Sequence, residues 1–379
     1  MILGDDRKNE VSAASVPSSV LFVVLAGGLG GSTRSVATVL AHLDPNRVHR
    51  VLATQPRGRF IELVRERQLA DTFIPLPTAG RRSLRRLSRV QAAWRVGSWL
   101  RANRPITAIH VNGPEELNVV ALAARVFRIP VVVWSHARVV SPWMRRLSWL
   151  WPHVFRDVKF AAVSPLARTV LVEGGLAQSQ EVEIVPNPID PQDVVGEPDG
   201  HDGFVVGYLG SDARYKGFQF LPGIIKELTD IPVRWLVFAD QHPSGDPEAW
   251  AELSRFPPDR VCVVGKLSDV REAYGRCDVV VCPSLEESFC RVAAEAMLNG
   301  VPVVGSDLGP LRDLLGSEDA GLLFPPGDDR VAAKAVRRLA DDPRLRESLG
   351  SRGRERARAF DPITVTSRLE DLYGLDHQS

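Results

Sequence analysis

The feature that most constrains this chain is a regular alternation of short apolar runs with amphipathic stretches. The first unit runs from Val20 to Ala26 as VLFVVLA, followed by the glycine-rich GGLGGSTRS and the helical pattern VATVLAHL. Further apolar runs are VHRVLAT, ITAIHV, PVVVWSHA and KFAAVS. Strands buried on both faces have such continuous apolar sequences, and strands that alternate with helices form parallel sheets with right-handed crossovers. The pattern therefore predicts an α/β fold.

The alternation pauses once, in a stretch rich in Pro, Gly and Asp at residues 186–203, and resumes at FVVGYLG. A chain of 379 residues is long enough for two domains. We therefore expect two Rossmann-like, doubly wound domains that face a central cleft, where ligands of such folds bind. The expected divisions are a disordered lead at 1–19, an N-terminal, acceptor-binding domain at 20–190, a linker at 191–203, a C-terminal, nucleotide-sugar-binding domain at 204–360, and a tail at 361–379 that packs back toward the N-terminal domain.

Composition and charge exclude several classes of protein. The formal net charge is +1, so no overall field attracts nucleic acid. The four cysteines form no CxxC pair and have no histidine at zinc-finger spacing, which favours reduced, buried thiols over a metal site. The polar N-terminus lacks the features of a signal peptide, and no run of about 18 apolar residues could span a membrane. We expect a cytoplasmic protein.

The strongest chemical signal is the stretch EESFCRVAAEAMLNGVPVVGSD, at residues 286–307, which follows the apolar run DVVVCPS at residues 278–284. Glu287 and Glu295 are eight positions apart, which does not put both on one face of a helix at about 100° per residue. We therefore place Glu287 in a loop above a strand and Glu295 within the first turns of the following helix. The N-terminus of that helix has free amide groups and a positive dipole end, which suit a diphosphate.

This stretch resembles the two-glutamate motif of retaining glycosyltransferases with the GT-B fold, specifically those of glycosyltransferase family four. The family pattern is roughly P-S-x-x-E-G-F-G-x-x-x-x-E-A-M-x-x-G-x-P-V-V. The positions in register are Pro283, Ser284, Glu287, Phe289, Glu295, Ala296, Met297, Gly300, Pro302, Val303 and Val304. The chain departs from the pattern at Ser288 and Cys290, where the family usually has glycine.

The resemblance covers most of the chain, from about residue 20 to residue 360. GGLGGS resembles the N-terminal glycine loop of the family, and VVVWSHA supplies His136, where the family has a histidine facing the sugar. AAVSPLARTVL and EVEIVPNPID resemble two further family segments. YLGSDARYKG resembles G-R-L-x-x-x-K-G, with Lys216 in register. Ser211 stands in place of the family's arginine, and Arg214 is the nearest substitute.

The resemblance implies retaining transfer of a sugar, expected to be a hexose, from a nucleoside-diphosphate sugar to an acceptor that the sequence does not identify. The implied catalytic residues are His136, Lys216 and Glu287. The implied donor-binding residues are Gly30, Gly31, Ser211, Arg214, Lys216, Glu287, Ser288, Phe289, Cys290, Arg291 and Glu295.

The implied roles agree with the chemistry of the leaving group, whose outer phosphate gains negative charge. Lys216, the amides of Gly30 and Gly31 and the helix N-terminus would stabilise that charge. Glu295 would bind the ribose hydroxyls, and Glu287, His136 and the backbone near Phe289 to Arg291 would hold the sugar. We expect no cofactor and no metal ion, because no Asp-x-Asp follows a strand. The leaving phosphate would then take the proton of the acceptor.

Four alternatives stay open at the level of sequence. The two glutamates and His136 have ordinary structural interpretations as solvated or satisfied side chains. A non-catalytic sugar-nucleotide-binding subunit, or more distantly a nucleotide-sugar epimerase, would fit the same fold. Two basic and aromatic stretches, at residues 81–104 and 137–160, either pack an apolar face on a sheet with arginines in water or lie on an anionic membrane surface. The second interpretation would place the protein at the inner membrane surface and favour a lipid-linked acceptor.

Overall fold

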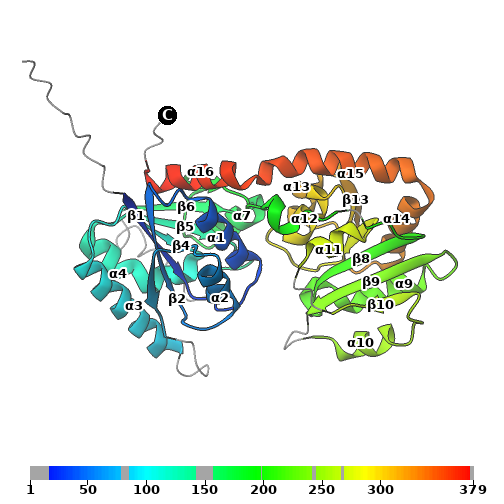
Figure 1. The fold of residues 1–379 in the computed structure, drawn as a ribbon, viewed down its shortest axis with the longest axis horizontal. Helices are drawn as coiled ribbons and strands as arrows, with labels where there is room; N and C mark the ends of the chain where they lie inside the picture. The colour runs from blue at the N-terminus through cyan, green and yellow to red at the C-terminus, as the bar shows by residue number, and fades with distance from the viewer. Residues whose placement is uncertain are drawn as a thin grey trace, which may run out of the picture.

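The computed structural model describes residues 17–77, 85–141, 157–197, 199–240, 245–265 and 269–375. The N-terminal half forms one parallel sheet flanked by helices (Figure 1). Its elements are β1 (Ser18–Val24), α1 (Gly31–His42), β2 (Val48–Thr54), α2 (Arg59–Glu66), β3 (Thr72–Pro75), α3 (Arg85–Ala102), β4 (Ala108–Val111), η2 (Pro114–Glu116), α4 (Leu117–Phe127), β5 (Val131–Ser135), β6 (Val158–Ala162), α7 (Pro165–Glu173), η4 (Ser179–Glu181) and β7 (Val182–Ile184).

The C-terminal half forms a second parallel sheet of the same kind. It is preceded by α8 (Pro191–Val194). Its elements are β8 (Phe204–Ser211), η5 (Arg214–Lys216), η6 (Phe218–Phe220), α9 (Leu221–Lys226), β9 (Val233–Asp240), α10 (Pro247–Leu253), β10 (Val261–Val263), α11 (Arg271–Gly275), β11 (Val279–Cys282), α12 (Arg291–Leu298), β12 (Val303–Ser306), α13 (Gly309–Leu315), β13 (Gly321–Phe324), α14 (Asp329–Asp341) and α15 (Pro343–Ala357). The chain ends with η7 (Arg358–Phe360) and α16 (Pro362–Tyr373).

Both sheets reverse their strand order beside their first strand. The orders are β3-β2-β1-β4-β5-β6-β7 and β10-β9-β8-β11-β12-β13, with every pair parallel. The chain thus builds each sheet on one side of its first strand and then crosses to the other. Ligands of doubly wound sheets bind outside the carboxyl ends of the strands at this reversal. The structure confirms the predicted pair of Rossmann-like domains.

The strands have the continuous burial that their sequences predict. Residues 20–24 of β1 and every residue of β5, β11 and β12 are buried. Each such aliphatic side chain contributes roughly 1.5–3 kcal/mol when it leaves water. One apolar cluster joins the N-terminal core to Phe289, Ala293 and Phe360 of the C-terminal half. The two domains therefore share a continuous apolar contact.

Two details differ from the expected domain divisions. β1 begins at Ser18, before the expected start of the N-terminal domain at residue 20, because backbone pairing with β2 continues past the apolar run. The expected lead at 1–19 is corrected to that extent, and residues 1–16 lie outside the described part of the chain. The expected linker at 191–203 includes the short helix α8.

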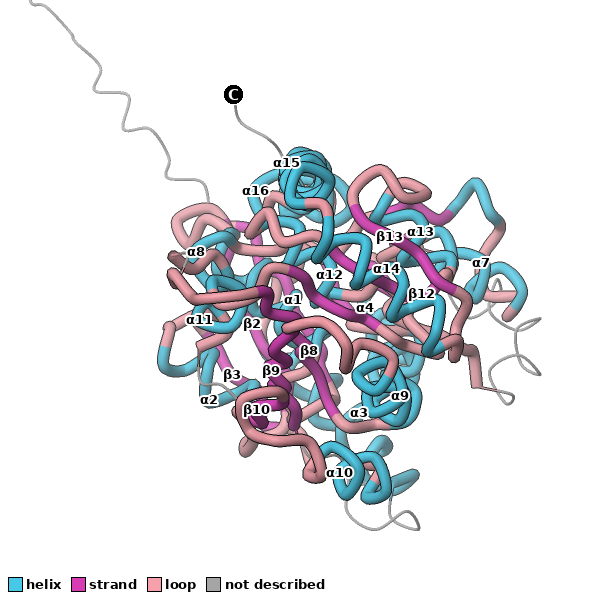
Figure 2. The backbone as a smooth tube through the Cα atoms, turned by 90° about the vertical axis from the view of Figure 1, so that its right-hand side faces the viewer, coloured by secondary structure: helices cyan, strands magenta, loops and turns pink. Residues whose placement is uncertain are grey.

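The C-terminal segment passes from one domain to the other. α15 packs against α12, η7 follows, and α16 packs against α1 of the N-terminal domain. Both helices run along the same side of the molecule (Figures 1 and 2). The Tyr373 hydroxyl lies 2.8 Å from His110 Nδ1 in β4, and Arg368 pairs with Glu183 at 2.7 Å. The last helix is therefore part of the surface of the N-terminal domain.

Candidate active site

Two loops of the C-terminal domain meet at the carboxyl ends of β8 and β11. A backbone hydrogen bond of 2.8 Å ties the loop after β11 to η5. Gly217 has φ +73°, and a Cβ there would collide with the Pro283 carbonyl oxygen, so this close approach requires glycine. The approach brings together Lys216 and Glu287, which are 71 positions apart in the sequence.

Lys216 and Glu287 form a shielded ion pair. Lys216 Nζ donates to Glu287 Oε1 at 2.8 Å, and the Ser284 hydroxyl donates to the same oxygen at 2.9 Å. Burial by itself would lower the pKa of Lys216, but the Glu287 carboxylate outweighs burial and holds that pKa above its ordinary value. Lys216 is therefore charged at neutral pH, and its ammonium can donate two further hydrogen bonds to an anion.

Glu295 lies in the second turn of α12 and is almost completely buried. Its Oε2 accepts a hydrogen bond of 2.7 Å from the Tyr274 hydroxyl, and its Oε1 accepts one of 2.7 Å from Arg291 Nε. Burial and then the Glu295 charge raise the pKa of Tyr274 well above its ordinary value, so the phenol keeps its proton and donates. These two donors fix the carboxylate and compensate its charge.

The Arg291 side chain reaches across to the N-terminal half of the chain. Its Nη1 donates to the Ser35 hydroxyl of α1 at 3.2 Å and to the Pro188 carbonyl at 3.0 Å. Ser35 in turn donates to Asn187 Oδ1 at 2.8 Å. The Arg291 side chain is 10% exposed. One guanidinium therefore joins α12 to α1 and to the segment before α8, in a place largely closed to water.

One of the two residues that replace the family's glycines, Cys290, keeps a backbone conformation typical of glycine. Cys290 caps α12 with φ 69° and ψ 71°, in the left-handed region that glycine adopts most readily. Its side chain and that of Phe289 are buried, and the Phe289 ring lies 5.3 Å from the Phe360 ring. Ser288 is half-buried. These two buried side chains belong to the core, so the expected contacts of Phe289 and Cys290 with a donor fall to their backbone amides.

The glycine loop before α1 has free space around Gly30 and Gly31. A Cβ added to Gly30 or Gly31 would meet no atom within 4 Å, so packing does not require glycine at either position. The Gly30 amide already donates to the Thr33 hydroxyl at 2.9 Å, which differs from its expected role toward phosphate. Gly31 is the first residue of α1, where amides have no acceptor within the helix. The structure therefore favours Gly31 over Gly30 as an anion ligand.

His136 follows β5, and its ring packs edge to face on Trp134 with 4.7 Å between ring centres. Burial, together with the positive charge of Arg291, lowers the pKa of His136 to about 3. The ring is therefore neutral at physiological pH. Its Nε2 is buried and has no hydrogen-bond partner among the described residues. A sugar hydroxyl would satisfy this nitrogen.

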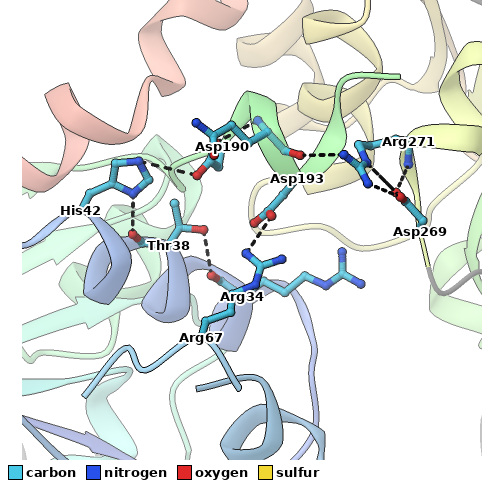
Figure 3. A network of polar contacts seen from close by, with 9 residues as sticks. Arg34, Thr38, His42, Arg67, Asp190, Asp193, Asp269 and Arg271 are labelled. Atoms are coloured by element: carbon cyan, nitrogen blue, oxygen red, sulfur yellow. Dashed lines mark hydrogen bonds and ion pairs between the residues drawn. The ribbon is translucent and has the colours of Figure 1, made fainter. Parts of the chain in front are cut away.

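A cavity of about 510 Å³ lies between the domains beside Arg291. Figure 3 shows its polar rim, where Arg67 pairs with Asp193 at 2.7 Å and Arg271 pairs with Asp269. Charges of both signs compensate one another along this rim. The cavity is lined by Leu29, Arg34, Ala37, Thr38, Ala41, Leu63, Arg67, Leu69, Asp190, Gln192, Asp193, Val194, Asp269, Val270, Arg271 and Arg291.

Comparison with known proteins identifies the family. A model described as Glycosyltransferase Family 4 matches residues 29–193, and one described as Glycosyl transferases group 1 matches residues 195–356. A phosphatidyl-myo-inositol mannosyltransferase of Mycobacterium leprae (strain TN) is 28% identical over 368 residues, covering 90% of this chain and 92% of that protein. This chain belongs to glycosyltransferase family four. It is therefore a glycosyltransferase, as the motif predicts.

Other members and neighbours extend this result. A 2-deoxystreptamine glucosyltransferase of Streptomyces kanamyceticus is 30% identical over 193 residues, covering 47% of this chain and 49% of that protein. The Anabaena protein Alr3699/HepE, solved with UDP and glucose, has a TM-score of 0.75 at 22% identity and covers 93% of this chain and 98% of its own. A Rickettsia africae glycosyltransferase has a TM-score of 0.80 at 14% identity, covering 96% and 100%. These structures confirm the GT-B fold.

Ser211, where this family-four chain lacks the arginine of the pattern, is the last residue of β8, and Arg214, its expected substitute, is the first residue of η5. The Ser211 carbonyl accepts a hydrogen bond of 2.7 Å from the Tyr208 hydroxyl. The Arg214 guanidinium pairs with Asp246 at 2.8 Å, and Asp246 also caps α10. Arg214 is therefore held at the start of α10, and the structure does not bring it to Glu287 as a substitute for the missing arginine.

Several residues that complete the site were missed in the sequence. Tyr274, Ser35 and Asn187 hold Glu295 and Arg291, but each reaches them from a segment that no local pattern connects to the motif. Ser284 lies inside the motif, and its role in holding Glu287 could have been inferred from its position. Among the described residues, no group of three or more His, Cys, Asp or Glu side chains is arranged to hold a metal ion.

Proposed function

We propose that this glycosyltransferase moves a hexose from a nucleoside-diphosphate sugar to an acceptor hydroxyl, with retention of configuration and without a metal ion or cofactor. The observation that carries the proposal is the Lys216–Glu287 pair at 2.8 Å beside the start of α12. A lysine and a helix N-terminus suit a diphosphate, and carboxylates suit sugar hydroxyls. Alr3699/HepE, which has the same fold, was solved with UDP and glucose, and this supports the donor class.

In this proposal Lys216 stabilises the charge that grows on the leaving diphosphate. It acts from a partly buried position, where such stabilisation is stronger than in open water. Glu287 Oε1 is occupied by Lys216 and Ser284, but a carboxylate has about four lone-pair sites and can still accept from hydroxyls of the sugar. The neutral ring of His136 supplies a hydrogen bond from the opposite wall. The leaving phosphate takes the proton of the acceptor on the same face, which preserves the configuration.

Product analysis tests this proposal. The purified protein is incubated with UDP-, GDP- and ADP-sugars and an acceptor panel, with and without EDTA, and the products are separated and assigned by NMR. We expect release of one nucleoside diphosphate, unchanged by EDTA, and a glycoside with the anomeric configuration of the donor. Donor binding without turnover would support a non-catalytic subunit, and a new nucleotide sugar would indicate an epimerase.

We also propose that α3 and α4 hold the enzyme against an anionic membrane surface. α3 has two apolar stripes: Ala92, Val96 and Leu100 are buried, whereas Leu87, Val90 and Trp94 face solvent. A Cβ added at Gly97 of α3 would lie 3.8 Å from the Cβ of Ala123 in α4, so the two helices lie side by side. α4 adds two more exposed side chains to this surface, Leu122 and Val126. The first basic stretch therefore packs on the sheet and also presents an apolar face, here named the α3–α4 face.

The charges of the segment that carries the α3–α4 face support an anionic partner. Residues 85–128 contain eight arginines and two acidic residues, Glu115 and Glu116, in a chain whose net charge is +1. Glu115 pairs with Arg89 at 2.8 Å, and burial raises the pKa of Glu116 to about 7. An apolar stripe among arginines suits anionic lipids. This placement favours a lipid-linked acceptor; the second basic stretch falls mainly on residues 142–156, outside the described residues.

Vesicle sedimentation tests the membrane contact. We expect binding to vesicles that contain phosphatidylglycerol, weak binding to phosphatidylcholine alone, and loss of binding at high salt. The double variant Trp94→Ser, Leu122→Ser should reduce partitioning by about tenfold or more, because two exposed apolar side chains are removed. Ile363→Ser, which changes an exposed side chain on α16, is the matched control. Equal loss in the control, or no preference for anionic vesicles, would contradict the proposal. No helix among the described residues is long and apolar enough to cross a bilayer.

A further inference from the structure

Arg291 has an unusual set of partners for a side chain of the glutamate motif. One guanidinium donates to Glu295 at 2.7 Å, to Ser35 at 3.2 Å and to the Pro188 carbonyl at 3.0 Å. The family pattern leaves position 291 open, so the motif itself does not require arginine there. The three acceptors belong to three separate segments: α12, α1 and the stretch before α8. The side chain therefore acts as a strut between the domains.

The orientation of the Glu295 carboxylate depends on that strut. Of its two donors, Tyr274 lies within the C-terminal domain, whereas Arg291 is held on its far side by the N-terminal half of the chain. Charge-assisted hydrogen bonds in a shielded place are among the stronger polar contacts in proteins. A shift of α1 away from α12 would take Ser35 from Arg291 and loosen one of the two donors that hold Glu295.

A purely structural role explains these contacts less well. Replacing a buried ion pair by apolar side chains of similar volume is often neutral or stabilising, so packing alone does not call for arginine here. The chain on the N-terminal side is also polar: Ser35 and Asn187 are both buried and hydrogen-bonded to each other at 2.8 Å. A continuous polar path thus runs from Glu295 through Arg291 and Ser35 to α1.

We propose that Arg291 is a positioning residue that makes recognition of the donor ribose by Glu295 depend on contact between the two domains. The inference rests on the proposed role of Glu295 in binding the ribose hydroxyls. Binding free energies are reciprocal, so a donor that engages Glu295 also strengthens the contact of Arg291 with α1. The donor thereby favours the arrangement in which the N-terminal wall meets its phosphates.

Calorimetric titration with paired nucleotides tests the inference. UDP, GDP and ADP are titrated first, and the nucleotide that binds is then compared with its 2′-deoxy form. The wild type should prefer the ribonucleotide by about tenfold or more, because the deoxy form lacks a hydrogen bond to a carboxylate. In Arg291→Met this preference should fall to about twofold, since Glu295 loses its second donor. Arg291→Lys, which keeps the charge and loses the planar fork, should restore it only in part.

A second variant, Ser35→Ala, keeps the inference testable if Arg291→Met does not fold. Ser35→Ala keeps the Arg291–Glu295 pair, removes one acceptor on α1 and suits a helix interior, so it should fold and reduce the preference by a few fold. Arg368→Met is the matched control, because Arg368 pairs with Glu183 and is half-exposed.

The outcomes separate this inference from the proposed function. A ribose preference that is unchanged in Arg291→Met and Ser35→Ala would overturn the inference alone. Absence of binding of all three nucleotides to the wild type would overturn the proposed donor class, and the inference with it. An equal loss of affinity for the ribonucleotide and the deoxynucleotide would also overturn the inference, because Arg291 would then act on the fold and not through Glu295.

Discussion

The two walls of the cleft use different chemistry. On the C-terminal wall, Lys216 pairs with Glu287 and Arg291 pairs with Glu295, so full charges stand ready beside the start of α12. On the N-terminal wall, the two groups expected to contact the donor, the ring of His136 and the amide of Gly31, are neutral; this part is here named the neutral wall. Charge develops mainly on the leaving phosphate during transfer. We therefore expect changes on the charged wall to reduce turnover most, and changes on the neutral wall to reduce affinity by smaller factors.

The largest expected effect is that of Lys216→Ala on the charged wall. It removes the cation proposed to stabilise the leaving diphosphate, so kcat should fall by about 10²- to 10³-fold. Steady-state kinetics with the donor identified above measures this. Lys226→Ala is the control, because Lys226 pairs with Glu252 on the surface and should leave kcat unchanged. A Lys216→Ala enzyme with nearly normal kcat would show that the charged wall does not control turnover, and would contradict the comparison of the two walls.

The second effect is that of Glu295→Gln on donor affinity. The affinity for the nucleotide should fall by about tenfold to a hundredfold, with a smaller change in kcat, because Glu295 is expected to touch the ribose and not the reacting bond. Arg291 loses its charged partner, so the free energy of unfolding should also fall, by about 1–3 kcal/mol. Calorimetry and urea unfolding measure the two changes. A loss of kcat as large as that of Lys216→Ala would remove the distinction between the glutamates.

The buried histidines of the N-terminal domain predict that the free energy of unfolding is sensitive to acid. Burial is the main cause that lowers the pKa of His110 and His136 to about 3. Between about pH 6.5 and pH 3 the unfolded chain binds protons that the folded protein excludes, so the free energy of unfolding falls as the pH falls. Each buried histidine should contribute about 2 kcal/mol of this loss at pH 5.

A variant isolates the histidine contribution, because Glu116, whose pKa burial raises to about 7, acts in the opposite direction over part of the same range. Urea unfolding of the wild type and His110→Gln is compared at pH 8 and pH 5. The variant should lose about 2 kcal/mol less than the wild type on acidification. Identical losses would mean that His110 is protonated in the folded protein.

The smallest expected effect separates two glycines. Gly31→Ala should lower donor affinity by about threefold to tenfold, because a methyl group would project into the open space before α1, and should leave the free energy of unfolding unchanged or slightly raised. Gly58→Ala is the matched contrast: its φ is +120° and a Cβ would collide with the Gly27 carbonyl, so it should lower stability by more than 1 kcal/mol. Thermal unfolding and calorimetry distinguish them. A strongly destabilised Gly31→Ala would show that this glycine serves the fold.

The fold could be predicted from the sequence because each strand of both sheets is a short apolar run and each helix an amphipathic stretch, which are local patterns. The apolar runs became buried strands, and the spacing of Glu287 and Glu295 placed one in the loop after β11 and the other in α12. The partners of those glutamates could not be predicted, because a contact such as that of Arg291 with Ser35 joins positions 256 apart and depends on how two domains meet. Arg214 lies near Lys216 in sequence, yet its side chain is held by α10.

The basic stretch at residues 81–104 shows a second limit of sequence. Leu, Val and Trp recur there at helical spacing, which allowed either packing on the sheet or contact with a membrane. The structure shows that α3 has both an inner and an outer apolar stripe. A periodic pattern predicts that a helix has an apolar face. Where a helix has two apolar stripes, the pattern cannot predict which of them is covered, because that depends on the neighbouring elements.

The two places where the chain passes between the domains lie against each other. The Ile189 amide, just before α8, donates to the Phe360 carbonyl of η7 at 2.9 Å, and the Phe289 ring packs on Phe360. Because the two crossings are bonded to each other, neither can shift alone without breaking the hydrogen bond between Ile189 and Phe360 or separating the two phenylalanine rings.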